Sequence, residues 1–340
     1  MSLEDWGWDA GWAAAFSSLA GPQAAAARVI DERRGVYGVA AADGEFDARL
    51  PGAVRRRAAA RADLPAVGDW IALERVRGER SALVRAVLPR RSKLSRRAAG
   101  EALEEQIIAA NLDEVFIVAA LDADFNERRL ERFLASCREG GAEPSLVLNK
   151  LDSCADPAPF LARARALAAG AAVLAVSARS GAGLDALAAR IGPGRTAAFV
   201  GSSGVGKSTL VNRLLGAERQ RTGLTRAGDG RGRHTTTRRE LVRLPGCGLL
   251  IDTPGLRVMA PWESERGLSE SFPEIDALAA SCRFQDCAHH AEPDCAVKAA
   301  AESGALAPQR LSAWRKLRDE AERKRAEEAR RRWKNPKGAR

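Results

Sequence analysis

Short apolar runs separated by turn residues occupy residues 36–97. The run GVYGVAA leads into Asp43-Gly44, a dipeptide typical of hairpin turns, and the runs FDARLPGAV, VGDWIALERV and SALVRAVLP follow at intervals that suit short strands. This pattern predicts a small β-barrel of the OB type. Ahead of it, residues 1–35 form an Ala-rich segment with three tryptophans, which we expect to cover a neighbouring apolar core; a stacking or partner site is the other interpretation.

Between residues 101 and 260, apolar strand runs alternate with helical patterns. We predict strands at EVFIVAAL, SLVLN, AVLAVSA and TAAFVG, with helices between them near 126–141, 157–169 and 183–190. This alternation predicts an α/β fold, with a mostly parallel sheet and helices on both faces. Residues 261–340 change character again, because a cysteine and histidine cluster precedes a charge-rich helical stretch.

The charge balance narrows the class of partner. The chain carries 54 Lys and Arg against 44 Asp and Glu, a formal net charge of +10, which favours binding to polyanions. The barrel segment is crowded with arginines and poor in aromatic residues, so it favours contact with RNA phosphates over base stacking; a solvated basic surface is the other interpretation.

No apolar run approaches the roughly 18–20 residues that span a bilayer, and the N-terminus lacks a basic start. We expect a cytoplasmic, monomeric protein with no membrane partner.

The segment GSSGVGKST matches the phosphate-binding loop at every fixed position, between a predicted strand and a predicted helix. Its glycines let backbone N–H groups turn toward phosphates, and the helix N-terminus adds a positive field. Lys207 is expected to reach the β- and γ-phosphates, and the Ser208 hydroxyl to ligate Mg²⁺. The residues assigned to this loop are Gly201, Ser202, Ser203, Gly204, Val205, Gly206, Lys207, Ser208 and Thr209.

Two further segments are typical of nucleotide switches. The strand LLID ends in Asp252, whose carboxylate can hold Mg²⁺ through water, and Gly255 of the following turn can contact the γ-phosphate. The polar loop upstream offers Thr235 or Thr236 as the threonine that meets Mg²⁺ and the γ-phosphate, and the sequence does not choose between them.

The residue that orients the attacking water in some GTPases is absent. In those proteins a glutamine follows the Asp-x-x-Gly turn, whereas this chain has Leu256. His234 is the nearest titratable side chain that can place the water, and a solvated loop histidine is the other interpretation.

The run SLVLNKLD supplies a base-reading motif. The Asp152 carboxylate can accept two N–H bonds from guanine, a pair of donors that adenine lacks. Asn149 can bond the base edge and brace the phosphate loop, and the Lys150 stem can pack over the ring. The next strand ends in Ser177-Ala178, where the Ala178 N–H can contact guanine O6. Two guanine-reading pieces in the correct mutual order, each at a strand end, argue against an accidental match.

These base-reading pieces precede the phosphate loop, whereas GTPases usually carry them after it. The linker GPGR at 192–195 would join the former C-terminus to the former N-terminus. Because domain termini often lie close together, such a rearrangement leaves the sheet intact. We therefore predict a circularly permuted P-loop GTPase domain that takes GTP with Mg²⁺.

A closed metal site is predicted near the C-terminus. Three thiolates and one imidazole within fourteen residues match a tetrahedral structural Zn²⁺ site, and the adjacent His290 is an alternative to the histidine ligand. Since no coordination position is left open, we assign no catalysis to this metal. The predicted ligands are Cys282, Cys287, His289 and Cys295.

The permuted order, the loop GRHTTT, the turn DTPG and this cysteine–histidine spacing together closely resemble the RsgA (YjeQ) family of small ribosomal subunit biogenesis GTPases, over roughly residues 36–300. The resemblance implies an N-terminal OB-fold domain, a circularly permuted GTPase domain and a C-terminal zinc-binding, mostly helical domain. It implies a GTPase that is stimulated by the 30S subunit, acts late in its maturation and binds rRNA. By position, it places GTP contacts at Asn149–Asp152 and Gly201–Thr209 and a catalytic histidine at His234.

The resulting hypothesis is a GTPase whose nucleotide state gates its binding to, and release from, the small subunit. We expect four parts, at 1–35, 36–100, 101–260 and 261–340, the last with a basic helical tail that is either a solvated helix or an RNA-contacting arm. A zinc-containing RNA-binding protein that only senses GTP is the second hypothesis, and an ATPase is the third.

Overall fold

The computed structural model describes residues 2–21, 23–33, 35–76, 81–97, 105–122, 125–202, 204–216, 239–252, 272–284 and 286–334. A five-stranded barrel comes first, and its strands are hydrogen-bonded in the order β1-β2-β3-β5-β4, with β4 pairing back onto β1. β3 and β5 are parallel and the other barrel pairings are antiparallel, as in an OB-type barrel. The strands are β1 (Ala25–Arg33), β2 (Val36–Ala41), β3 (Gly44–Arg49), β4 (Trp70–Arg75) and β5 (Ser81–Val87).

The barrel departs from the sequence prediction at its edges. Its first strand, β1, lies upstream of residue 36, within the range that the sequence analysis assigns to the Trp-rich segment. The end of FDARLPGAV forms helix α2 (Gly52–Arg57) rather than strand, since Pro51 has no N–H to give to a strand ladder. After the short helix η2 (Arg61–Asp63), a separate antiparallel ribbon of β6 (Lys93–Arg97) and β7 (Glu105–Ala110) spans the expected boundary at residue 100.

The Trp-rich segment covers an apolar core, as predicted. It contains η1 (Glu4–Trp6) and α1 (Ala10–Leu19), and the Asp9 carboxylate caps α1 by accepting the Trp12 N–H at 2.9 Å. Trp6 and Trp12 are buried in the same cluster as Trp70 of the barrel, and the Trp8 ring meets Trp70 edge-on with centroids 4.7 Å apart.

The α/β domain contains a six-stranded sheet with the order β10-β9-β8-β11-β13-β12. All neighbours are parallel except β12, which is antiparallel to β13. Strand β11, which leads into the phosphate loop, therefore lies between a strand of the base-reading half and a strand of the switch half. The edge strand β12 continues into the barrel through the pair Asp31 and Glu240. The strands are β8 (Glu114–Ala120), β9 (Glu143–Asn149), β10 (Ala172–Ala175), β11 (Thr196–Gly201), β12 (Glu240–Arg243) and β13 (Leu249–Asp252).

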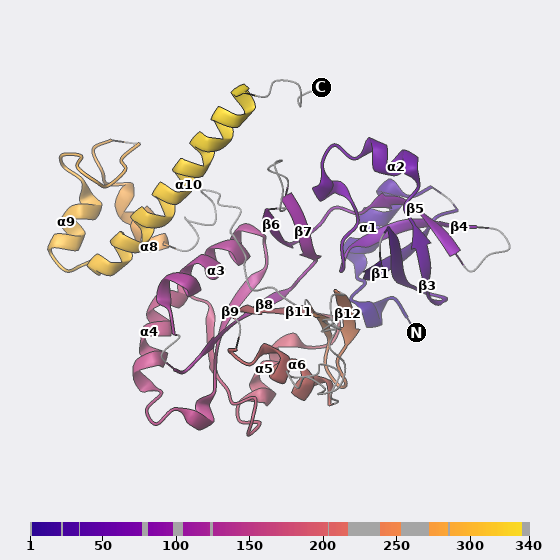
Figure 1. The fold of residues 1–340 in the computed structure, drawn as a ribbon, viewed down its shortest axis with the longest axis horizontal. Coiled ribbons are helices and arrows are strands. Elements are labelled where there is room, and N and C mark those ends of the chain that lie inside the picture. The colour runs from indigo at the N-terminus through magenta and orange to yellow at the C-terminus, as the bar shows by residue number, and fades with distance from the viewer. Residues whose placement is uncertain are drawn as a thin grey trace, which may run out of the picture.

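Helices cover both faces of this sheet (Figure 1). Successive residues of the buried strand β8 point to opposite faces: Val115 and Ile117 pack in the cluster that contains α3 and α4, and Phe116 and Val118 in the cluster that contains α5 and α6. A strand buried on both faces must be apolar throughout, which is why EVFIVAAL has no alternation. The helices are α3 (Glu127–Glu139), η3 (Leu151–Ser153), α4 (Ala158–Ala168), α5 (Leu184–Ile191) and α6 (Lys207–Leu215).

The C-terminal part is helical and lies on the far side of the α/β domain from the barrel (Figure 1). Its own apolar cluster includes Phe272, Ile275, Leu311 and Trp314. Within the described ranges, no helix has the length and apolar character needed to cross a membrane. The helices are α8 (Pro273–Ala279), α9 (Ala296–Glu302) and α10 (Pro308–Lys334).

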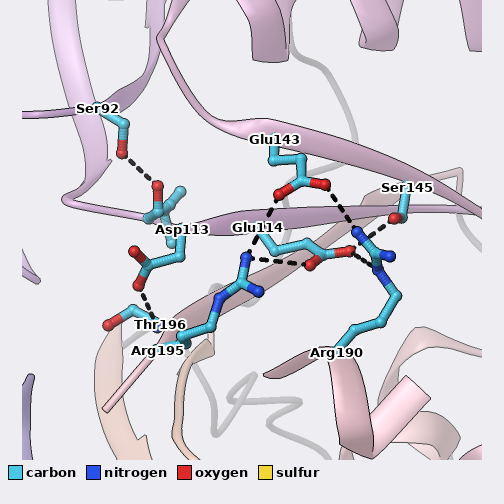
Figure 2. A network of polar contacts seen from close by, with 9 residues as sticks. Ser92, Asp113, Glu114, Glu143, Ser145, Arg190, Arg195 and Thr196 are labelled. Carbon is cyan, nitrogen blue, oxygen red and sulfur yellow. Dashed lines mark hydrogen bonds and ion pairs between the residues drawn. The ribbon is translucent and has the colours of Figure 1, made fainter. Parts of the chain in front are cut away.

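A polar network closes the junction between the two halves of the α/β domain, at the amino ends of its strands (Figure 2). Glu114 of β8 is 1% exposed, accepts the Ser145 hydroxyl at 2.6 Å, and forms ion pairs with Arg190 of α5 and, at 3.4 Å, with Arg195. The Thr196 N–H, at the start of β11, donates to Asp113 at 2.7 Å. These contacts tie both ends of the linker at 192–195 to Glu114, the first residue of β8, and to Asp113 just before it.

Candidate nucleotide site and metal cluster

Asn149 physically joins the base-reading motif to the phosphate loop. It ends β9, is 2% exposed, and donates from Nδ2 to the Val205 carbonyl at 2.8 Å. Its Oδ1 accepts the Ala178 N–H at 2.9 Å. One side chain therefore connects three segments that are separated along the chain but meet at the carboxyl edge of the sheet, where open α/β sheets bind ligands.

The Asp152 carboxylate lies at the same edge, exposed and oriented by a neighbour. The Ser177 hydroxyl donates to Asp152 Oδ1 at 2.5 Å, and this bond holds the pKa of Asp152 below its ordinary value. An ionised carboxylate with accepting capacity is what a guanine N1–H and N2–H pair requires.

Two glycines of the phosphate loop, Gly204 and Gly206, have left-handed backbone conformations. Gly206 has φ +98°, and a Cβ there would lie 2.2 Å from Asn149 Nδ2, so both its conformation and its packing require glycine. The Lys207 ammonium donates to the Gly201 carbonyl at 2.7 Å and to the Ser202 carbonyl. Ser208, on the first turn of α6, is exposed at the mouth of the loop.

The switch residues are only partly within the described ranges. Asp252 ends β13, directly after Ile251, which pairs with Ala198 of β11, so its carboxylate lies beside the strand that leads into the loop. The other residues predicted for the switches fall outside the described residues: His234, Thr235, Thr236 and Gly255. Ser203 of the phosphate loop also falls outside them.

Two side chains at this site were not predicted. Asp122, two residues after β8, forms an ion pair with the Lys150 ammonium at 2.8 Å, and Lys150 has a left-handed backbone with φ +69°. Arg129, on the first turn of α3, donates to the Ser202 hydroxyl. The sequence could have indicated Asp122, because it directly follows a buried strand and ligands bind at such strand ends. It gave no comparable indication for Arg129, since an arginine on an amphipathic helix is ordinary.

The four predicted metal ligands converge. Their ligand atoms all lie within 4.8 Å of one another, with 3.8 Å between the sulfurs of Cys282 and Cys295 and 3.4 Å between Cys295 Sγ and His289 Nδ1. Tetrahedral zinc bonds place two sulfurs ~3.8 Å apart and a sulfur and a nitrogen ~3.5 Å apart. The donor set and its spacing therefore fit Zn²⁺.

Helix α10 fixes the backbone of this cluster. Arg315 and Arg318 donate to the carbonyls of His289 and Cys287, respectively, and the Trp314 ring lies 4.9 Å from the His289 ring. Burial and the nearby Arg318 lower the pKa of His289, which favours the neutral imidazole that binds metals.

The strands of the α/β domain lie in the spatial order of a nucleotide-binding GTPase, but they follow one another along the chain in a rotated order. This combination defines a circularly permuted GTPase. The chain is similar to the small ribosomal subunit biogenesis GTPase RsgA of Opitutus terrae, with 47% identity over 94% of this chain and 90% of that protein. It is 44% identical to the protein of that name from Syntrophotalea carbinolica, with the same coverage. The profile of the RsgA GTPase family matches residues 87–262. The chain belongs to the RsgA GTPase family and is a GTP-hydrolysing enzyme.

Solved structures agree with this fold. YjeQ from Thermotoga maritima superposes with a TM-score of 0.66 at 24% identity, covering 88% of this chain and 98% of that one. YloQ, described as a circularly permuted GTPase, superposes with a TM-score of 0.65 at 23% identity, covering 89% and 96%. The predicted permutation and the N-terminal barrel are thereby confirmed.

Proposed function

We propose that this GTPase acts on the small (30S) ribosomal subunit, and that GTP binding and hydrolysis gate its attachment to, and release from, that subunit late in maturation. The curated relatives that match nearly the whole chain carry the name small ribosomal subunit biogenesis GTPase, which supports this partner. The basic barrel and the basic helix α10 suit contact with rRNA phosphates. A factor of this kind works in the cytoplasm, and we propose that it does so as a monomer.

The observation that carries the nucleotide-binding part of the proposal is the bridge made by Asn149. Because its amide bonds both Val205 of the phosphate loop and Ala178, which lies in the turn after β10 rather than in the strand itself, we infer that binding of the base and binding of the phosphates are coupled. We assign guanine recognition to this half of the site and phosphate binding to residues 201–209. The guanine-reading residues are Asn149, Lys150, Asp152, Ser177 and Ala178.

The switch half completes the site. Ser208 and Asp252 would hold Mg²⁺, together with Thr235 or Thr236, and when bound this ion neutralises charge that develops on the phosphates. We propose that Gly255 senses the γ-phosphate and that His234 orients the attacking water, since Leu256 cannot.

The C-terminal cluster is proposed to hold one structural Zn²⁺ through Cys282, Cys287, His289 and Cys295. Its role would be to keep the α8–α9 loop and α10 in one arrangement that faces RNA.

We also propose the four-part division of the chain, with the barrel beginning at its first strand, at residue 25.

Phosphate release in the presence and absence of purified small subunits tests this function. We expect slow release alone, clear stimulation by subunits, and loss of stimulation in His234→Ala. Hydrolysis that is never stimulated would contradict the proposed partner, and full stimulation of His234→Ala would contradict the role of the histidine. Family membership favours hydrolysis over mere sensing of GTP.

Nucleotide selectivity tests the base-reading half separately. Asp152→Asn should weaken guanine nucleotides and shift preference toward xanthine nucleotides, because the amide supplies a donor where the carboxylate accepted. Competition binding with GTP, XTP and ATP measures this. Equal binding of ATP and GTP by the unmodified protein would overturn the assignment.

A further inference from the structure

Two cationic side chains converge on Ser202, the second residue of the phosphate loop. Arg129 donates from Nη1 to the Ser202 hydroxyl, and Lys207 donates from Nζ to the Ser202 carbonyl. Arg129 belongs to α3 in the base-reading half, and Lys207 to α6 in the phosphate-binding half. These two helices cover opposite faces of the sheet (Figure 1), so the loop is reached from both sides.

The reach of Arg129 follows from the local fold. Strands β8 and β11 are parallel neighbours, with Val118 opposite Gly201, so the helix that follows β8 begins at the edge where the loop begins. The Asn126 side chain caps α3 by accepting the Arg129 N–H at 3.0 Å, which fixes the backbone from which the long side chain extends.

The charges at Ser202 suit a polyanion. Two positive groups that share one residue repel each other, and an anion bound between them removes that repulsion. A guanidinium stays charged and carries its N–H donors in a planar fork, a geometry that suits both hydroxyl and phosphate oxygens. The neighbouring Arg128 is exposed and has the same charge on the same helix, but its side chain has no bond to the loop in the part of the chain that is described.

We propose that Arg129 is a positioning residue of the phosphate cradle. It holds Ser202 in place from α3 and, together with Lys207, sets the loop for the β-phosphate of the nucleotide. This inference rests on the proposed GTP site and adds to it a residue from outside the loop and outside the base-reading motifs.

Competition against fluorescent GDP, with GMP, GDP and GTP as competitors, tests the proposal. Arg129→Ala should weaken GDP and GTP by about 5- to 20-fold, the size of one lost charge-assisted hydrogen bond, and change GMP by less than about twofold, since GMP has no β-phosphate. Arg129→Lys should recover part of the loss because the charge remains. The matched control, Arg128→Ala, should leave all three affinities unchanged.

A double-mutant cycle tests the route through Ser202. If Arg129 acts by holding the Ser202 hydroxyl, Ser202→Ala and Arg129→Ala should each weaken GDP, and the double variant should be no weaker than the worse single variant. Additive losses would overturn positioning through Ser202. Equal losses for GMP, GDP and GTP would also overturn the proposal, because they indicate a general distortion of the domain.

The failure of this inference can be told from the failure of the proposed function. If the unmodified protein does not bind guanine nucleotides, the proposed function fails. If it binds them and Arg129→Ala behaves like Arg128→Ala, only the role of Arg129 fails. Thermal unfolding without nucleotide, compared between the Arg128 and Arg129 variants, separates folding defects from loss of the bond.

Discussion

Glu131 of α3 is a carboxylate that is buried where the C-terminal helices meet the α/β domain. Only 6% of its side chain is exposed, and Arg310 of α10 pairs with it at 3.3 Å while also pairing with Glu274 at 2.6 Å. Burial raises the pKa of Glu131 from the ordinary 4.5 to about 6, against the opposing effect of Arg310. The ion pair therefore does not offset the desolvation of the carboxylate.

This shift predicts that acid strengthens the attachment of the C-terminal helices. The pKa of Glu131 is higher when the C-terminal helices are docked against α3, so docking takes up a proton. The free-energy cost of burying the ionised carboxylate is fully present above pH 6, and it is relieved as the pH falls toward 4.5. The full shift corresponds to about 2 kcal/mol, of which about 1.2 kcal/mol, or roughly eightfold in the docking equilibrium, is gained between pH 7.5 and pH 5. Within the part of the chain that the structure describes, Glu127 and Arg128 of the same helix also act on Glu131.

Hydrogen exchange in α3 and in the first turn of α10, corrected for its intrinsic pH dependence, measures this. Protection should rise roughly eightfold from pH 7.5 to pH 5 in the unmodified protein, and Glu131→Gln should be flat over that range because it cannot ionise. Glu127→Gln, which removes a more exposed carboxylate from the same helix, should keep the rise. Zinc content is followed throughout, since acid also releases metals. The same slope in the unmodified protein and in Glu131→Gln would refute the reasoning.

Three further changes test separate parts of the structure. Asn149→Ala leaves the Ala178 N–H and the Val205 carbonyl without their partner, so the nucleotide-free protein should lose about 2–4 kcal/mol in urea unfolding; an unchanged midpoint would contradict the bridge. Glu114→Gln removes the negative charge that Arg190 and Arg195 share, and should cost about 1–3 kcal/mol and speed protease cleavage at residues 192–195; unaltered cleavage would show that the network does not hold the junction. Zinc removal by a chelator should raise hydrogen exchange in α8–α10 and leave GDP affinity unchanged; loss of GDP binding would contradict a purely structural metal.

The sequence was most informative where function depends on neighbouring residues. The phosphate loop, the strand that precedes it and the Cys-x4-Cys-x-His spacing each lie within a short segment, so their backbone chemistry is visible in the residue order. The central strands β8, β9 and β11 were predicted for the same reason, because a strand buried on both faces is a continuous apolar run. The edge strand β12 was not predicted, since only its two middle residues are buried. The first barrel strand was missed because charged residues break its apolar run into short pieces, with neither a continuous apolar stretch nor a regular alternation.

By itself, the residue order determined which chemical groups this protein has and that its GTPase motifs occur in rotated order. Only the tertiary structure decided which of those groups touch: Asn149 with Val205, Arg129 with Ser202, Glu131 with Arg310 and Glu114 with Arg195. These partners are 56 to 179 residues apart along the chain. Parallel strands bring the first two pairs together at the carboxyl edge of the sheet and Glu114 with Arg195 at its amino edge, whereas Glu131 meets Arg310 where α10 packs against α3. In each case tertiary packing, rather than local propensity, selects the contact.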